Sequence, residues 1–160
     1  MALLVQDADG LITDAESYIS VAELDAYWTK RGNTTFVALS EAEKEILLIK
    51  ATDYVEQVYF GKWLGDRYSD TQNTEYPRTI DYLNVGIPTR LKNACAELAL
   101  KANSGELLID IAQRVVKKKV AVIETTYSEY SDQLTQYTNV YNLLSPYLES
   151  TGNSVKVTKG

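Results

Sequence analysis

Two copies of one helix-start signal constrain this sequence more than any other feature. Ser20 is followed three residues later by Glu23, and Ser40 is followed in the same way by Glu43. In such a capping box, each of the two residues satisfies a free backbone amide of the other, so a helix begins there. The sequence therefore predicts two helices whose starting points are fixed by local chemistry.

Each of these helices ends at a glycine and carries an apolar face. The first is expected at about 21–31, before Gly32, and the second at about 41–60, before Gly61. Glycine takes the left-handed conformation of a helix cap without strain. Apolar residues recur at spacings of three and four, which places them on one side of each helix. The residues expected to be buried are Val21, Leu24, Tyr27 and Trp28 in the first helix, and Leu47, Leu48, Ala51, Tyr54, Val55 and Val58 in the second.

A third helix is expected at about 88–103. Pro88 stands at its start, where the missing proline N–H costs nothing, and Gly105 follows its end. Several of its apolar positions hold small residues, which let neighbouring backbones approach closely. This helix is therefore expected at the centre of the fold. Its expected core positions are Leu91, Ala94, Cys95, Leu98, Ala99 and Ala102.

The other segments show weaker patterns. Glycines, a proline and a polar run predict a long ordered loop over 62–87. A run rich in β-branched residues predicts a strand over 119–127. Helical spacing returns from Leu134 to Leu144, and Pro146 is expected to kink or restart that last helix.

The predicted fold class is mainly α: a small helical bundle (1–150) with a short β element and an extended C-terminal arm (151–160). Residues 3–5 fit an edge strand or an arm, and 109–116 fit a short helix or irregular structure. Val155 and Val157 alternate with polar residues, a minimal strand pattern. We expect the arm to add as a strand to a neighbouring subunit or partner. The interface candidates are Tyr137, Tyr141, Tyr147, Val155 and Val157.

The charge balance argues against strong nucleic-acid binding. Sixteen Lys and Arg face 22 Asp and Glu, which gives a net charge of -6. An acidic chain is repelled on average by phosphates, so binding to single-stranded DNA is expected to be weak or absent at physiological salt. One basic cluster stands out, and it fits either protection of a strand edge or a contact to phosphate or an acidic partner. It consists of Arg114, Lys117, Lys118 and Lys119.

The residue inventory excludes most catalytic chemistry. The chain has no histidine, which removes Ser-His and Cys-His nucleophile pairs and histidine-ligated metals. Cys95 is the only cysteine, and it lies on an apolar helix face, where a buried thiol is expected. We therefore expect a binding protein and not an enzyme, with no cofactor and no metal. No stretch of about 18 apolar residues predicts a membrane span.

Three ordered segments resemble a known family. They are Asp14 to Glu23 with Arg31-Gly32-Asn33; Ala51 to Val55; and Tyr76 to Thr79 followed by Ile87-Pro88 and Ala94 to Ala99. Together they resemble small proteins of tailed bacteriophages that carry the label DnaT-like single-stranded-DNA-binding protein. By gene setting and fold, that family resembles the head–tail connector, or head-completion, adaptors.

The resemblance implies a structural adaptor in the neck of a phage virion, present in the host cytoplasm before assembly. Such adaptors form rings, typically dodecamers, between the portal protein above and the tail or a second neck component below. Double-stranded DNA would pass through the ring without sequence-specific binding, and no membrane contact is expected. The alternative is single-stranded-DNA binding in phage replication. That function needs a basic groove with aromatic rings that stack on bases.

Overall fold

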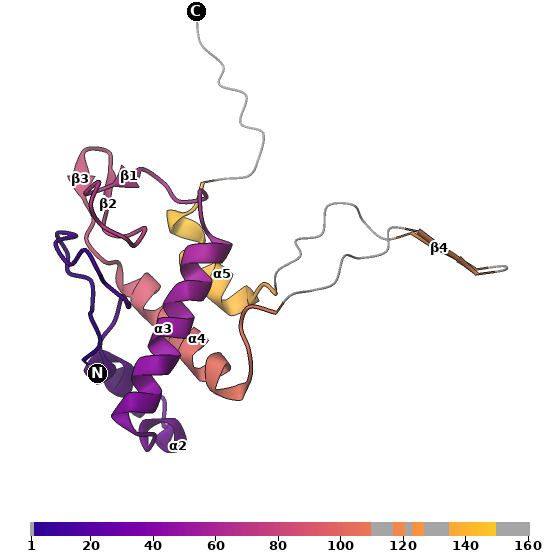
Figure 1. Cartoon of the computed structure of the whole chain (residues 1–160), viewed down its shortest axis with the longest axis horizontal. Coiled ribbons are helices and arrows are strands. Elements are labelled where there is room, and N and C mark those ends of the chain that lie inside the picture. The colour runs from indigo at the N-terminus through magenta and orange to yellow at the C-terminus, as the bar shows by residue number, and fades with distance from the viewer. Residues whose placement is uncertain (1, 110–116, 121–122, 127–134, 150–160) are drawn as a thin grey trace, which may run out of the picture.

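The computed structural model describes residues 2–109, 117–120, 123–126 and 135–149, and it is mainly α-helical. Figure 1 shows α3 crossing in front of α4, with α5 beside them and the strands β1 to β3 at one end. This arrangement confirms the predicted fold class. The helices are α1 (Val21–Thr29), α2 (Thr34–Val37), α3 (Glu41–Val58), α4 (Thr89–Ser104) and α5 (Thr138–Leu144), followed by the 3-10 turn η1 (Ser145–Tyr147).

Both capping boxes form as the sequence predicts. The Ser20 hydroxyl accepts from the Glu23 N–H at 3.2 Å, and the Glu23 carboxylate accepts from the Ser20 N–H at 2.9 Å. The box of Ser40 and Glu43 has the same two bonds, at 3.3 and 2.9 Å. Gly32 and Gly61 have φ of 71° and 67°, the left-handed conformation that the helix ends require. The two helices are each two residues shorter at the C-terminal end than expected.

The core lies where the apolar faces of α3, α4 and α5 meet. Every core position expected on α3 and α4 is buried, and Ala51, Leu98 and Ala99 have no exposed surface. From α1, Leu24 and Trp28 are buried, whereas Val21 and Tyr27 are only half-buried. The central place of α4 is confirmed, because it packs against α1, α3 and α5. Pro88 is the residue before α4 and not its first residue.

A small sheet forms inside the segment 62–87, which the sequence predicts as a long ordered loop. The strands β1 (Asp66–Arg67), β2 (Arg78–Ile80) and β3 (Leu83–Asn84) form an antiparallel sheet in the order β1-β2-β3. Its anchor is the buried Arg78, whose guanidinium donates to the Leu64 carbonyl at 2.9 Å, contacts the Gly65 carbonyl and pairs with the Glu75 carboxylate at 2.6 Å. Strands of two or three residues are too short to show alternation, so the sequence missed this sheet, although most of 62–87 is loop as predicted.

The second β element is a hairpin of β4 (Lys117–Val120) and β5 (Ile123–Thr126), with Lys119 opposite Glu124. The sequence predicted β structure there but as one strand. The sequence also missed α2, which begins where the Asn33 side chain accepts from the Phe36 N–H at 3.2 Å. Arg114 and the arm (151–160) lie outside the described residues.

Candidate functional site

Three cationic side chains share one hollow between the end of α1 and the start of α4. The hollow has a volume of about 290 Å³. Lys30 and Arg31 come from the end of α1, and Lys92 comes from the first turn of α4. The complete lining is Ile19, Glu23, Ala26, Tyr27, Lys30, Arg31, Thr89, Lys92 and Asn93.

The place of the two α1 cations follows from the way that helix ends. Lys30 is the C-cap residue, and Arg31 follows it before the left-handed Gly32. Cations are favoured there because the carbonyl end of a helix carries partial negative charge. Within the described part of the chain, neither Lys30 nor Arg31 forms an ion pair, and both side chains are exposed. Their charges are therefore available to a ligand.

Arg31 lies on the ring of Tyr27. The centre of its guanidinium is 3.3 Å from the ring centroid, and the same group donates to the Tyr27 carbonyl at 3.0 Å. The Tyr27 hydroxyl donates to the Glu97 carboxylate at 2.7 Å. Partial burial, then the hydrogen bond to Glu97 and the Glu97 charge, raise the pKa of Tyr27 to about 12, against a lowering by Arg31. Tyr27 is therefore neutral at physiological pH. Its ring supports the Arg31 guanidinium, which offers a flat surface to a ligand.

Lys92 is the one cation of the hollow that already has a partner. Its ammonium lies 2.6 Å from the Glu23 carboxylate. Partial burial acts to raise the pKa of Glu23, but hydrogen bonds from Lys92 and Ser20 outweigh it and hold that pKa below its ordinary value. Glu23 therefore stays ionised at neutral pH, and a ligand has to share Lys92 with it.

The first turn of α4 supplies backbone donors beside these side chains. Pro88 stands at the N-cap and provides no side-chain hydrogen bond to the first turn. Within the described residues, the amides of Thr89 and Arg90 have no acceptor. A helix start with free amides and partial positive charge favours an anion, and phosphate is the common case.

The lysines predicted for phosphate contact do not line this hollow. Lys117, Lys118 and Lys119 form most of β4, and Arg114 lies outside the described residues. The sequence reasoning missed the α1–α4 hollow because Lys92 is about 60 positions from the Lys30-Arg31 pair. One usable signal was present: a tyrosine four residues before an arginine places both on the same side of a helix end.

The three candidate tyrosines have different surroundings. The Tyr137 ring lies 5.4 Å from that of Tyr54 and under the Lys101 ammonium at 4.8 Å. Tyr147 packs edge-on against Tyr76 at 6.4 Å. Tyr141 is exposed. Val155 and Val157 lie outside the described residues, so the predicted interface stays a prediction.

Over residues 2–109 and 135–149, no group of three or more acidic or cysteine side chains has the arrangement of a metal site. None of the described helices is long and apolar enough to cross a membrane. Burial raises the pKa of the Cys95 thiol well above its usual range. That thiol is therefore a core group and not a nucleophile.

Comparison with known proteins identifies the family. The model of the family described as "Putative DnaT-like ssDNA binding protein" matches residues 1–160, so the chain belongs to that family. No curated protein and no solved structure matches the chain.

This match corrects the identity drawn from the resemblance. It supports the DnaT-like label but gives no support to a head–tail connector. The expectation of a virion structural protein was wrong, because the family description is one of single-stranded-DNA binding. The inference had leaned on the acidic net charge. That sum conceals a local basic surface, because three of the 16 cations, Lys30, Arg31 and Lys92, line the hollow with a single carboxylate, Glu23.

Proposed function

We propose that this protein is a non-enzymatic binding protein that holds single-stranded DNA in the hollow between α1 and α4. The observation that carries the proposal is the Arg31 guanidinium stacked on Tyr27 at 3.3 Å, with Lys30 and Lys92 in the same hollow. Membership of the DnaT-like family supports the class of ligand.

The stacked guanidinium would act as the platform for a base. Proteins that bind single strands stack bases on aromatic rings and on the flat face of arginine. One face of Arg31 covers Tyr27, and the side chain is exposed, so its outer face is open to a base. Thr89 and Asn93 line the same hollow and offer polar atoms to the base edges.

The strand's phosphates would lie against the cations and the open start of α4. Lys30 has no ion-pair partner among the described residues, and the Thr89 and Arg90 amides are free. Lys92 would exchange part of its contact with Glu23 for a phosphate oxygen. Two lysines and two amides make a small phosphate site, so the affinity is modest and falls with salt, by about 0.7 in log K per decade for each phosphate neutralised.

Direct binding tests this proposal. Fluorescence anisotropy of a labelled oligo(dT) of about 20 nucleotides, longer than common site sizes, should report binding at low salt. Lys30→Gln and Arg31→Gln should each weaken it by roughly tenfold, the worth of one charged hydrogen bond of about 1.5 kcal/mol.

Lys62→Gln is the matched control, because Lys62 is exposed, has no ion-pair partner among the described residues and lies beyond the far end of α3. Its net charge change equals that of Lys30→Gln, so it should bind like the unaltered protein. Equal weakening by Lys62→Gln would show that only net charge matters, and no binding at low salt would contradict the proposal outright.

A further inference from the structure

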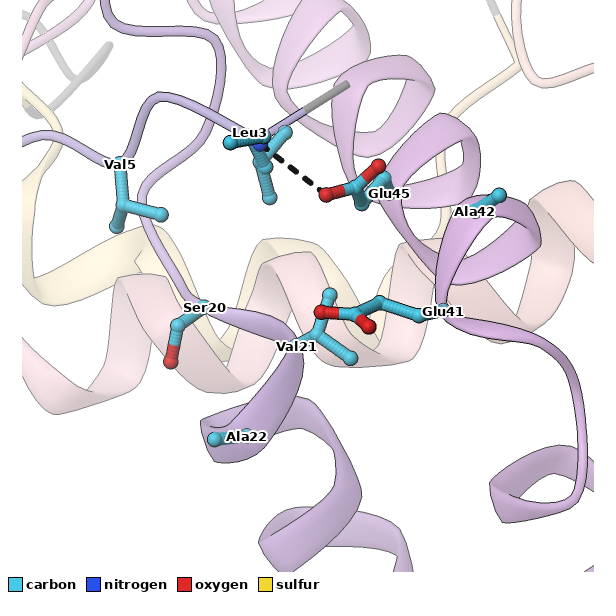
Figure 2. A pocket seen from close by; sticks show the side chains of 9 residues that line it. Leu3, Val5, Ser20, Val21, Ala22, Glu41, Ala42 and Glu45 are labelled. Atoms are coloured by element: carbon cyan, nitrogen blue, oxygen red, sulfur yellow. Dashed lines mark hydrogen bonds between the residues drawn. The ribbon is translucent and has the colours of Figure 1, made fainter.

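A second surface lies on the other side of α1, between the N-terminal segment and the start of α3. Two adjoining hollows of about 690 and 240 Å³ share Ala2, Leu3, Ala42 and Glu45, so they form one groove. Figure 2 shows Leu3 and Val5 facing Glu41, Ala42 and Glu45 of α3, with Val21 of α1 between them.

One wall of this groove is an open strand edge. Val5 forms a parallel bridge with Ser17, in which the Leu4 carbonyl accepts from the Ser17 N–H at 3.2 Å and the Gln6 N–H donates to the Ser17 carbonyl at 2.8 Å. The N–H and C=O of Val5 therefore point away from Ser17, as in any strand pair. Within the described chain, neither group has a hydrogen-bond partner.

The Leu3 N–H shows that this free edge faces the groove. It donates to the Glu45 carboxylate across the groove at 3.1 Å (Figure 2). Leu3 and Val5 are two residues apart, so their backbone groups point to the same side. An extended peptide placed in the groove would thus meet the unpaired N–H and C=O of Val5.

The lining defines the chemistry of that peptide. Its apolar part comes from Leu3, Val5, Val21, Ile46 and Ile49, of which Ile46 is 55% exposed. Its charged part is entirely acidic: the carboxylates are Glu16, Glu41 and Glu45, and among the described residues that line the groove there is no Lys or Arg. The groove fits a strand that alternates small apolar and basic residues.

We propose that the groove receives the C-terminal segment of a second copy of this chain, with Val155 and Val157 turned to the apolar lining and Lys156, on the opposite face, turned to the carboxylates. The sequence from Val155 to Thr158 is Val-Lys-Val-Thr, in which apolar and polar residues alternate. Lys159 follows this alternating run and adds positive charge at its end. Main-chain bonds to Leu3 and Val5 would supply affinity, as in other cases of strand addition.

Chain length favours a second copy over the same chain. The Glu149 N–H donates to the Lys62 carbonyl at 2.8 Å, just past the C-terminal end of α3, whereas Glu45 lies in the second turn from its start. Glu45 and Val58 are separated by about 20 Å along the helix. Val155 is six residues after Glu149 and reaches about 20 Å only when fully extended. The C-terminal segment of the same chain would therefore have no spare length with which to follow the surface of the protein to the groove.

Disulfide trapping tests the placement. A Val157→Cys protein mixed with a size-tagged Ala42→Cys protein should give a linked heterodimer under mild oxidation, because Ala42 is exposed and lines the groove. Ala38→Cys is the matched control: it is also an exposed alanine but lies outside the groove, after α2. Equal linking to Ala38→Cys, or no linking, would overturn the proposal. A double variant that links only within one chain would overturn the second-copy assignment.

The mass in solution is an independent readout. The full chain should self-associate, and a chain ending at Glu149 should be monomeric with an unchanged helical circular-dichroism spectrum. If the shortened chain fails to fold, the full-length Lys156→Glu/Lys159→Glu variant takes its place and should also be monomeric. Self-association unaffected by these changes would contradict the proposal. If these changes abolish self-association but leave DNA binding intact, the inference about the groove and the proposed function are shown to be separate.

Discussion

The Glu56 carboxyl group couples the stability of the fold to pH. It lies under the loop before β2, where it accepts from the Glu75 N–H at 3.0 Å and contacts the Tyr18 hydroxyl. Burial raises the pKa of Glu56 to about 7; hydrogen bonds from Tyr18 and Glu75 oppose this shift, and the charges of Glu75 and Asp53 add to it. The native protein therefore holds a proton on Glu56 that the unfolded chain releases.

The size of the effect follows from that difference. Glu56 goes from an ordinary pKa of 4.5 to about 7 on folding, and each unit is worth 1.36 kcal/mol, so the upper bound is about 3 kcal/mol. Since the folded pKa is raised, this stabilisation is complete below about pH 4.5 and is lost as the pH rises through about 7. Glu56→Gln cannot ionise and should remove this loss.

Urea unfolding at pH 5, 6, 7 and 8 measures the effect. The unaltered protein should lose up to about 2.5 kcal/mol more stability over this range than Glu56→Gln does, because part of the effect is already lost at pH 5. Glu106→Gln is the control, because that carboxylate is 73% exposed, and it should show the same pH dependence as the unaltered protein. Parallel curves for Glu56→Gln and the unaltered protein would refute the reasoning.

Two further substitutions test the packing. Leu98→Ala, at a site with no exposed surface, should lower the free energy of unfolding by about 2–5 kcal/mol in urea titrations; a cost below about 1 kcal/mol would mean that α4 is not central. Gly65→Ala places a Cβ 2.1 Å from the Thr79 carbonyl oxygen at a φ of +71°, so it should lower the melting temperature by several degrees. Gly61→Ala is the control: it has the same left-handed strain but no close neighbour, so it should lower the melting temperature less.

Local chemistry made the main helices predictable. Each capping box is a local signal whose hydrogen bonds form within four residues: Ser20 with Glu23, and Ser40 with Glu43. The apolar spacing of α4 identified Leu98 and Ala99 as core residues. These features depend on no distant part of the chain, so the sequence contains all the information they need.

The sheet and the hollow depend on distant contacts, and the sequence did not reveal them. β1 and β2 pair Asp66 with Thr79 across a loop, and each is too short to show a pattern. The hollow joins the end of α1 to the start of α4, and only the packed helices bring Arg31 and Lys92 together. The net charge can be read directly from the sequence, but it is negative and therefore argued against a basic site.

The salt dependence of DNA binding tests the central claim most directly. Single-stranded DNA releases about 0.7 counterions for each phosphate that a protein neutralises. Phosphate contacts from Lys30 and Lys92, with Arg31 stacked on a base, therefore predict a slope of about −1.4 for log K against log salt, measured by anisotropy with oligo(dT). The Lys30→Gln/Arg31→Gln variant should flatten the slope to about −0.7, while Lys62→Gln should leave it unchanged. A slope that is the same in all three proteins would contradict the account, because the DNA would then contact another surface.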